Sequence, residues 1–202
     1  MKIDSLNTFD ELARRSLDGP FLDADEAYRL LCDESLDLLG LLGAAYTVRR
    51  HHWGKKVRVH ILNNVQNGHC PEDCSYCAQG KKSNAGAIED YPMKNDEEIL
   101  DEARRAHEAG AFRYCMVFAG RGPSDKRTER LAHLVRTIKE RYPIEVCVST
   151  GILKEGQAET LKQAGLDRLN HNLNTTRENY PNICSTHTFE DRLRTLRYAR
   201  AA

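Results

Sequence analysis

Hydrophobic positions along the chain follow two different periods, and the change between them lies just beyond Gly54. In the first fifty residues, short apolar stripes at helical spacing follow acidic residues, which favour the beginning of a helix. Residues 10–13, 23–31 and 36–42 therefore predict a polar, helical N-terminal segment. Cys32 lies on the second stripe, where we expect a small buried core residue.

Beyond that point, short apolar runs alternate with longer helical stripes. The expected strands are 57–65, 112–118, 144–148 and 166–173, and the expected helices are 96–109, 125–142, 154–164 and 188–201. Strands that alternate with helices of this length form a parallel sheet with helical crossovers. An open doubly wound sheet and part of a (β/α) barrel both fit, and both place functional residues after the strands. The expected domains are 1–52, a helical extension, and 53–202.

Composition and charge exclude several classes of protein. The chain has 202 residues, of which 40% are hydrophobic and 30% are charged, as is typical of soluble globular proteins. Lysine plus arginine equals aspartate plus glutamate, at 30 each, so no net field favours nucleic acid or an anionic membrane. No segment approaches the roughly 18 apolar residues of a membrane span, and residues 1–5 do not begin a secretory signal. We expect a cytoplasmic protein that binds neither nucleic acid nor membrane.

The chain contains 7 cysteines, and Cys70, Cys74 and Cys77 lie close together after the first predicted strand. In a reducing compartment such thiols serve metals or catalysis rather than disulfides. The spacing C-x3-C-x2-C allows three thiolates to ligate three irons of a cubane cluster. The fourth iron is then open to a small molecule.

A structural zinc ion is the alternative. It would take four protein ligands, and His69 is the candidate for the fourth, but it adjoins Cys70, and adjacent residues fit one tetrahedral ion poorly. A bacterial ferredoxin would have the spacing C-x2-C-x2-C. A non-catalytic metal-binding module therefore stays open as an alternative to an enzyme.

The sequence around these cysteines resembles the radical S-adenosylmethionine superfamily, and its flanking motifs resemble the biotin synthase branch. The motifs are Cys70-Pro-Glu-Asp-Cys74-Ser-Tyr-Cys77-Ala-Gln79, Arg113-Tyr-Cys115-Met116, Leu169-Asn-His-Asn-Leu-Asn-Thr175, Tyr180-Pro-Asn-Ile183 and Thr186-His-Thr-Phe-Glu-Asp-Arg-Leu193. The resemblance implies an α/β fold of the TIM-type (β/α) barrel kind. We expect about the first four βα units of that barrel after the helical extension, with the C-terminal half absent and activity of the chain alone in doubt.

The resemblance implies a sulfurtransferase that converts dethiobiotin into biotin. Cys70, Cys74 and Cys77 would hold a [4Fe–4S] cluster that binds S-adenosylmethionine and cleaves it reductively. The resulting 5′-deoxyadenosyl radical would remove hydrogens from dethiobiotin so that sulfur can enter. The implied partners are an electron donor such as flavodoxin or ferredoxin, and a second subunit in a homodimer of the full-length protein.

The resemblance also implies a [2Fe–2S] cluster as the sulfur donor, and Cys115 and Cys147 match two of its ligands. From the residues alone, a strand cysteine is a small buried hydrophobe. The third cysteine and an arginine of that site belong to later strands, beyond Ala202. We expect Cys184 to be a non-ligand. Another radical enzyme of this superfamily, similar to a hydrogenase maturase, is the alternative that the two strand cysteines argue against.

Three asparagines, Asn170, Asn172 and Asn174, alternate at the end of the fourth predicted strand and should face one side of the sheet. Amide groups both donate and accept hydrogen bonds, which suits ribose hydroxyls and a ureido ring. By resemblance, Asn170 binds dethiobiotin, whereas Asn172 and Asn174 bind S-adenosylmethionine. Turn-forming asparagines that end a strand are the structural alternative.

Overall fold

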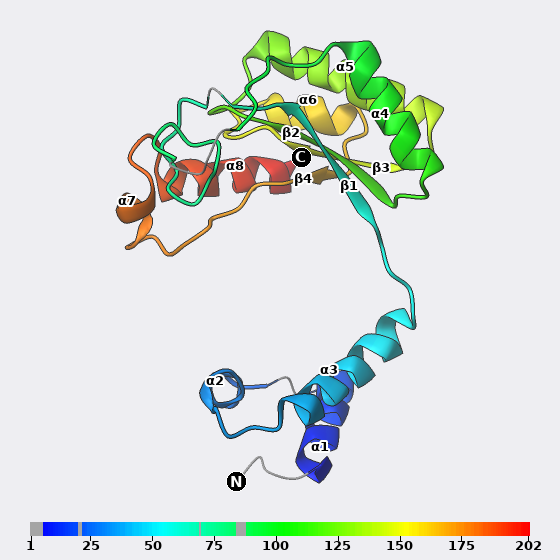
Figure 1. Ribbon diagram of the computed structural model, residues 1–202, viewed down its shortest axis with the longest axis vertical. Helices are drawn as coiled ribbons and strands as arrows, with labels where there is room; N and C mark the ends of the chain where they lie inside the picture. Colours follow the sequence, from blue (N-terminus) through cyan, green and yellow to red (C-terminus); the bar gives the residue numbers. More distant parts are fainter. Residues whose placement is uncertain (1–5, 20–21, 69, 84–87) are drawn as a thin grey trace. The chain divides into compact units, whose positions relative to one another are not determined.

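The computed structural model describes residues 6–19, 22–68, 70–83 and 88–202 of the chain. It divides into two compact units, Met1–Val57 and Arg58–Ala202 (Figure 1). His69, the candidate fourth zinc ligand, and residues 1–5, for which no secretory signal is predicted, lie outside the described residues. No helix within the described ranges is long and apolar enough to cross a membrane.

The first unit is helical, as predicted. Its helices are α1 (Leu6–Asp18), α2 (Ala24–Cys32) and α3 (Leu38–Trp53). A capping box begins α2, since the backbone N–H of Glu26 donates to Asp23 Oδ1 at 2.7 Å and the Glu26 side chain accepts from Asp23. Helices α1 and α3 pack together through a small core of Phe9, Leu12, Ala13 and Ala44.

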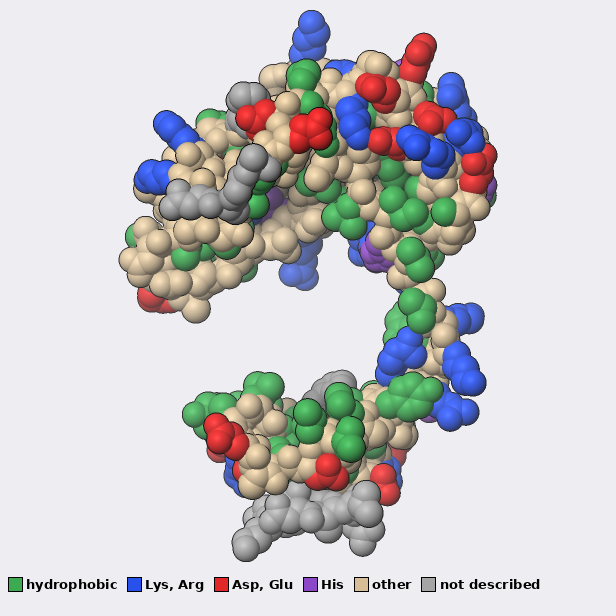
Figure 2. Space-filling view, viewed as in Figure 1, with side chains coloured by type: hydrophobic (Ala, Val, Ile, Leu, Met, Phe, Trp, Pro, Cys, Tyr) green, Lys and Arg blue, Asp and Glu red, His purple; other side chains and the backbone are tan. Residues whose placement is uncertain are grey.

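Helix α2 contributes no buried residue, so the prediction that Cys32 lies in a core is wrong: its side chain is exposed. Large apolar side chains also lie on the surface of this unit (Figure 2). The large exposed ones in this unit are Tyr28, Leu31, Leu38, Leu39, Leu42, Tyr46, Trp53 and Val57.

The second unit contains a sheet of four parallel strands in the spatial order β1-β2-β3-β4. The strands are β1 (His60–Gln66), β2 (Arg113–Phe118), β3 (Glu145–Ser149) and β4 (Arg168–Leu169). Spatial order equals chain order, as in consecutive strands of a (β/α) barrel, whereas a doubly wound sheet reverses direction at its switch point. The predicted α/β alternation is confirmed.

Helices α4 (Asp96–Glu108), α5 (Asp125–Arg141), α6 (Gln157–Gln163) and α8 (Phe189–Ala201) follow the four strands and contact one another in chain order. They pack on one face of the sheet through alternate strand residues. This core includes Tyr114, Met116, Val146 and Val148 from the strands and Ile99, Leu131, Leu134 and Leu161 from the helices. The other strand residues must therefore point to the opposite face.

The register of the strands places Cys115 beside Cys147, with Leu62 and Arg168 on either side in the same row. Both cysteines alternate with core residues, so they lie on the face away from the helices. The sheet thus brings together two thiols from different strands.

Two local features differ from the prediction. Strand β4 ends at Leu169 rather than near residue 173, because its partner β3 ends at Ser149 and leaves nothing further to pair with. The chain turns away at Gly151, whose φ of +82° and close approach to the carbonyl of Arg121 leave no room for a side chain. The short helix α7 (Tyr180–Ile183) was not predicted.

Candidate functional site

The loop that carries Cys70, Cys74 and Cys77 follows β1, at the carboxyl end of the sheet. Two turns shape it: the N–H of Cys77 donates to the Cys74 carbonyl at 3.1 Å, and the N–H of Gly80 donates to the Cys77 carbonyl at 2.9 Å. A Cβ at Gly80 would lie 2.8 Å from the Cys74 carbonyl oxygen. The loop therefore needs glycine at this position to fold tightly around its cysteines.

The same loop is tied to the segment after α7. The N–H of Ser75 donates to the Ile183 carbonyl at 2.9 Å, and the N–H of Ser185 donates to Asp73 Oδ1 at 2.8 Å. Hydrogen bonds from Ser185 and Lys82 hold the pKa of the buried Asp73 carboxyl well below its ordinary value. Asp73 thus remains a carboxylate and fixes the loop against a distant part of the chain.

A cavity of about 220 Å³ lies over this loop and brings together six of the predicted site residues. These are the cysteines 70, 74 and 77 and the asparagines 170, 172 and 174. The asparagines follow β4 in a loop instead of extending the strand, but all three still line the cavity. Asn174 has a φ of 70°, and its Nδ2 donates to Tyr76 Oη at 2.5 Å.

Arg192 of α8 also lines the cavity, and no role was predicted for it. Its guanidinium donates to the hydroxyl of Tyr76 at 3.0 Å and to the carbonyl of Asn172 at 3.0 Å. Its Nε donates to Nε2 of His187 at 3.1 Å. A guanidinium held in this way presents a fixed positive charge that suits a carboxylate.

His187 is held in turn by Glu72, whose carboxylate accepts from its Nδ1. Both side chains are buried, with 2% and 7% of their surface exposed. Since Nδ1 donates to Glu72 and Nε2 accepts from Arg192, the imidazole is satisfied on both sides. Glu72, His187 and Arg192 lie within motifs that carried the family resemblance, which was the available signal for them.

His171 lies between the asparagines and also lines the cavity. Burial lowers the pKa of its imidazole to about 4. Its Nε2 is buried without a hydrogen-bond partner among the described residues. The ring is therefore neutral near pH 7.

Cys115 and Cys147 are 5% and 6% exposed and do not line this cavity as far as the described residues show. Val117 and Ser149, two residues further along the same strands, do line it. A rise of about 3.3 Å per residue puts the thiol pair about 7 Å deeper on the same face. The hydrogen bond with Cys147 and burial raise the pKa of the Cys115 thiol above its ordinary value.

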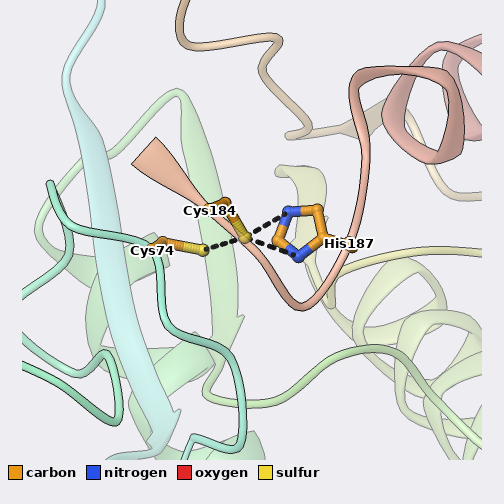
Figure 3. A group of neighbouring side chains, drawn as sticks. All are labelled: Cys74, Cys184 and His187. Carbon is orange, nitrogen blue, oxygen red and sulfur yellow. Dashed lines mark hydrogen bonds between the residues drawn. The ribbon is translucent and has the colours of Figure 1, made fainter. Parts of the chain in front are cut away.

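Cys184 lies against the loop, although we expected it to be a non-ligand. The ligand atoms of Cys74, Cys184 and His187 all lie within 4.8 Å of one another, and all three residues are buried (Figure 3). The Sγ atoms of Cys74 and Cys184 are 3.9 Å apart, and Cys184 Sγ is 3.3 Å from His187 Nδ1. A divalent ion could be held here only if His187 gave up a present hydrogen bond.

The donor set of the loop fits an iron–sulfur cluster. Three thiols from one short loop line one cavity, and thiolate is the soft ligand that such clusters take. Burial raises the pKa of the Cys74 thiol to about 11, so iron must displace its proton. The open side of the cavity carries Arg192, amides and a tyrosine, which are suited to a polar, charged small molecule.

A parallel βα unit of this kind with three cysteines after its first strand defines a class of enzyme. A sequence profile of the radical SAM superfamily matches residues 65–202, and the chain belongs to this superfamily. Membership supports a [4Fe–4S] cluster and S-adenosylmethionine as the cofactors of the site.

Within that class, the curated relatives confirm the resemblance to biotin synthase. The chain is 55% identical over 191 residues to the biotin synthase of Magnetococcus marinus, which covers 95% of this chain and 59% of that protein. It is 52% identical over 176 residues to the biotin synthase of Acaryochloris marina. This alignment covers 87% of this chain and 51% of that protein. The chain therefore spans between half and three fifths of the length of these relatives.

Solved structures share the fold at lower identity. Methylornithine synthase superposes with a TM-score of 0.79 at 22% identity, covering 94% of this chain and 56% of that one. The hydrogenase maturase HydG from Carboxydothermus hydrogenoformans superposes with a TM-score of 0.77 at 21% identity. The match covers 96% of this chain and 46% of that one. These likenesses support the (β/α) barrel fold and nothing about the substrate.

Proposed function

We propose that this chain carries the radical-generating half of a biotin synthase-like sulfurtransferase, which converts dethiobiotin into biotin by sulfur insertion. The observation that carries the proposal is the shared cavity: three loop cysteines and three asparagines, far apart in the chain, line one site. Sequence identity of 55% to a biotin synthase supports the choice of reaction.

In this proposal Cys70, Cys74 and Cys77 hold the [4Fe–4S] cluster, and the cavity above them takes S-adenosylmethionine. When bound, the cluster would supply the electron that cleaves S-adenosylmethionine and so starts hydrogen removal from dethiobiotin. Arg192 binds the carboxylate of S-adenosylmethionine, because hydrogen bonds to Tyr76 and Asn172 fix its guanidinium on the cavity wall. Arg121 lines the same cavity, but its guanidinium donates to Glu72 and Thr186 instead.

The three asparagines bind two different ligands in this proposal. Asn172 and Asn174 hydrogen-bond S-adenosylmethionine, and Asn170 hydrogen-bonds the ureido ring of dethiobiotin. All three side chains are exposed to solvent in the cavity-lining loop, so their amides are accessible to a ligand. Asn174 already bonds Tyr76 of the cysteine loop, which ties ligand binding to the cluster site.

Cys115 and Cys147 are the proposed ligands of a [2Fe–2S] cluster that donates sulfur. The support is their adjacent register, their burial and their place below the cavity on the same face of the sheet. Two thiols cannot complete such a site, so further ligands must come from elsewhere in the protein. This pair also favours biotin synthase over a hydrogenase maturase-like enzyme.

The remaining proposals concern the setting of the reaction. A cytoplasmic location follows from chemistry that needs reduced thiols. An electron donor such as flavodoxin or ferredoxin would deliver the electron, and the full-length protein would form a homodimer.

Anaerobic reconstitution with iron and sulfide tests the central proposal. We expect a brown protein whose cluster spectrum changes on addition of S-adenosylmethionine, and formation of 5′-deoxyadenosine after reduction with dithionite. Cys74→Ser should abolish both results, whereas Cys32→Ser, at an exposed cysteine of the first unit, should change neither. Stoichiometric zinc without any response to S-adenosylmethionine would instead favour the non-catalytic metal-binding module, for which Cys74, Cys184 and His187 are candidate ligands.

A further inference from the structure

Cys184 has no part in the proposed function, yet its sulfur is held close to a proposed cluster ligand. Its Sγ lies 3.9 Å from Cys74 Sγ, and the two residues are 5% and 8% exposed (Figure 3). They are separated by 110 residues in the chain, so the approach is created by the fold.

The backbone on both sides of each cysteine holds the pair face to face. Ser75, after Cys74, donates its N–H to the carbonyl of Ile183, before Cys184, at 2.9 Å. Asp73, before Cys74, accepts from the N–H of Ser185, after Cys184, at 2.8 Å. The two neighbours of one cysteine are thus bonded to the two neighbours of the other. This arrangement keeps the backbones of the two cysteines close together while either side chain rotates.

We propose that Cys74 and Cys184 form a redox pair that closes into a disulfide when the loop holds no cluster. The S–S bond length is about 2.05 Å, so the sulfur atoms must approach by about 2 Å, which side-chain rotation can supply. A disulfide would remove one of the three thiolates needed for loading. The consequence for cluster loading rests on the proposed function, but formation of the disulfide does not.

A second cavity gives an oxidant a route to the pair. It has a volume of about 490 Å³, and Cys184, Asp73 and Ser185 line it. Cys74 lines the cavity described above instead. Cys184 is therefore the sulfur that meets a small oxidant entering from the outside, and Cys74 is the sulfur that resolves it.

A hydroperoxide is the class of oxidant that fits, because it is small and needs only one thiol to begin. The Cys184 thiol gives up its proton, its sulfur attacks one oxygen of hydrogen peroxide, and the O–O bond breaks. This step leaves a sulfenic acid on Cys184, and the departing hydroxide takes up the thiol proton to become the first water. Cys74 sulfur then attacks the sulfenic sulfur, and the S–O bond breaks. Hydroxide takes the remaining proton and leaves as water. The two sulfurs lose two electrons in total, and one peroxide is reduced to two waters.

Peptide mapping of the cluster-free chain tests this pair. One equivalent of hydrogen peroxide is added, remaining thiols are alkylated, and tandem mass spectrometry assigns any linked sulfurs. We expect a peptide linking Cys74 to Cys184, two hydrogens lighter than the sum of its parts, and loss of alkylation at both positions. Full alkylation of both, or linkage of Cys74 to Cys70 or Cys77 instead, would overturn the proposal.

Cluster loading gives the second readout. The oxidised chain should take up little iron and sulfide until dithiothreitol is added, after which loading should match that of untreated chain. Cys184→Ser should load equally well before and after the same peroxide treatment, whereas the control Cys32→Ser should behave like wild type. Equal peroxide sensitivity of wild type and Cys184→Ser would contradict the proposal.

The two proposals fail in different ways. A reduced chain that loads a cluster and responds to S-adenosylmethionine, but never links Cys74 to Cys184, loses only the redox pair. A chain that forms this link but binds zinc alone after reduction loses only the proposed function.

Discussion

The loop cysteines and the strand cysteines are placed by two different physical means. Cys70, Cys74 and Cys77 lie in one short loop, shaped by turns and tied by backbone and side-chain hydrogen bonds to residues 183–186. Cys115 and Cys147 lie on neighbouring strands and meet because the parallel register pairs them. One group depends on local polar contacts and the other on the packed sheet.

Because the two groups are held differently, substitutions near them should have different effects. Side chains of a loop that is held by hydrogen bonds can adjust their positions. This freedom suits thiols that must bind a metal cluster and leave one side of it open to the cavity. A pair held by strand register moves only if the sheet moves, since the helix-facing side of both strands is fully buried. Substitutions in the loop should therefore affect chemistry first, and substitutions in the strands should affect stability.

The largest effect should come from Cys74→Ala. It removes a ligand that the proposed cluster requires, so the reconstituted chain should lose essentially all of its iron and its spectral response to S-adenosylmethionine. The free energy of unfolding of the cluster-free chain should change much less, which urea titration can measure. Normal iron content in this variant would show that the loop is not the cluster site.

Cys115→Ala should distinguish iron bound by the loop cysteines from iron bound by the strand cysteines. The loop is untouched, so its [4Fe–4S] absorbance and response to S-adenosylmethionine should remain. Any iron bound by the strand pair should disappear, along with its contribution to the spectrum measured by electron paramagnetic resonance. If this variant instead lost the loop cluster as well, the two groups would not be independent.

Met116→Ala should destabilise the sheet without touching either thiol group. Met116 is fully buried on the helix-facing side of β2, and truncating such a side chain costs about 2–5 kcal/mol. The matched control is Ser75→Ala, at an exposed loop position, which should stay within about 0.5 kcal/mol of wild type. Urea unfolding of the two variants compares them directly.

His171→Gln should produce the smallest effect near pH 7, and its effect should become visible as a change in pH dependence at lower pH. Burial lowers the pKa of His171 to about 4, so below its ordinary value near 6.5 the unfolded chain binds a proton that the folded chain does not. The free energy of unfolding should thus fall as pH decreases from about 6.5 to about 4, by at most about 1.4 kcal/mol per pH unit from this group. The variant should show a shallower fall between these pH values. An identical slope would mean that folding does not lower the pKa of His171.

Much of the fold could be predicted because the spacing of apolar residues along the chain directly reflects which side of each helix or strand is buried. The change from helical stripes to short apolar runs located all four strands and the helices after them. Chain order then placed the cysteine loop at the carboxyl end of the first strand. The strand cysteines were suspected from resemblance, but their pairing depends on register, which the sequence pattern does not contain.

The features that the sequence pattern does not predict depend on contacts between residues that are distant in the chain. The segment 170–173 has the alternation of a strand but lacks a partner, since β3 ends first. Cys32 has the spacing of a core residue, but among the described residues α2 packs on the first unit's core through the partly buried Leu30, and Cys32 stays exposed. The hydrogen bond between Glu72 and His187 joins residues more than a hundred positions apart, and α7, which begins at Tyr180, is too short to produce a periodic pattern.

The register of Cys115 against Cys147 also limits how this chain can vary over evolution. Loops and helices between the strands can gain or lose residues, because such a change leaves each strand in phase with its neighbour. An insertion of one residue within β2 or β3 would turn the following side chains to the opposite face of the sheet. Natural length variation should therefore be found in the connections, and the spacing from each strand cysteine to the cavity-lining residue two positions later should be invariant.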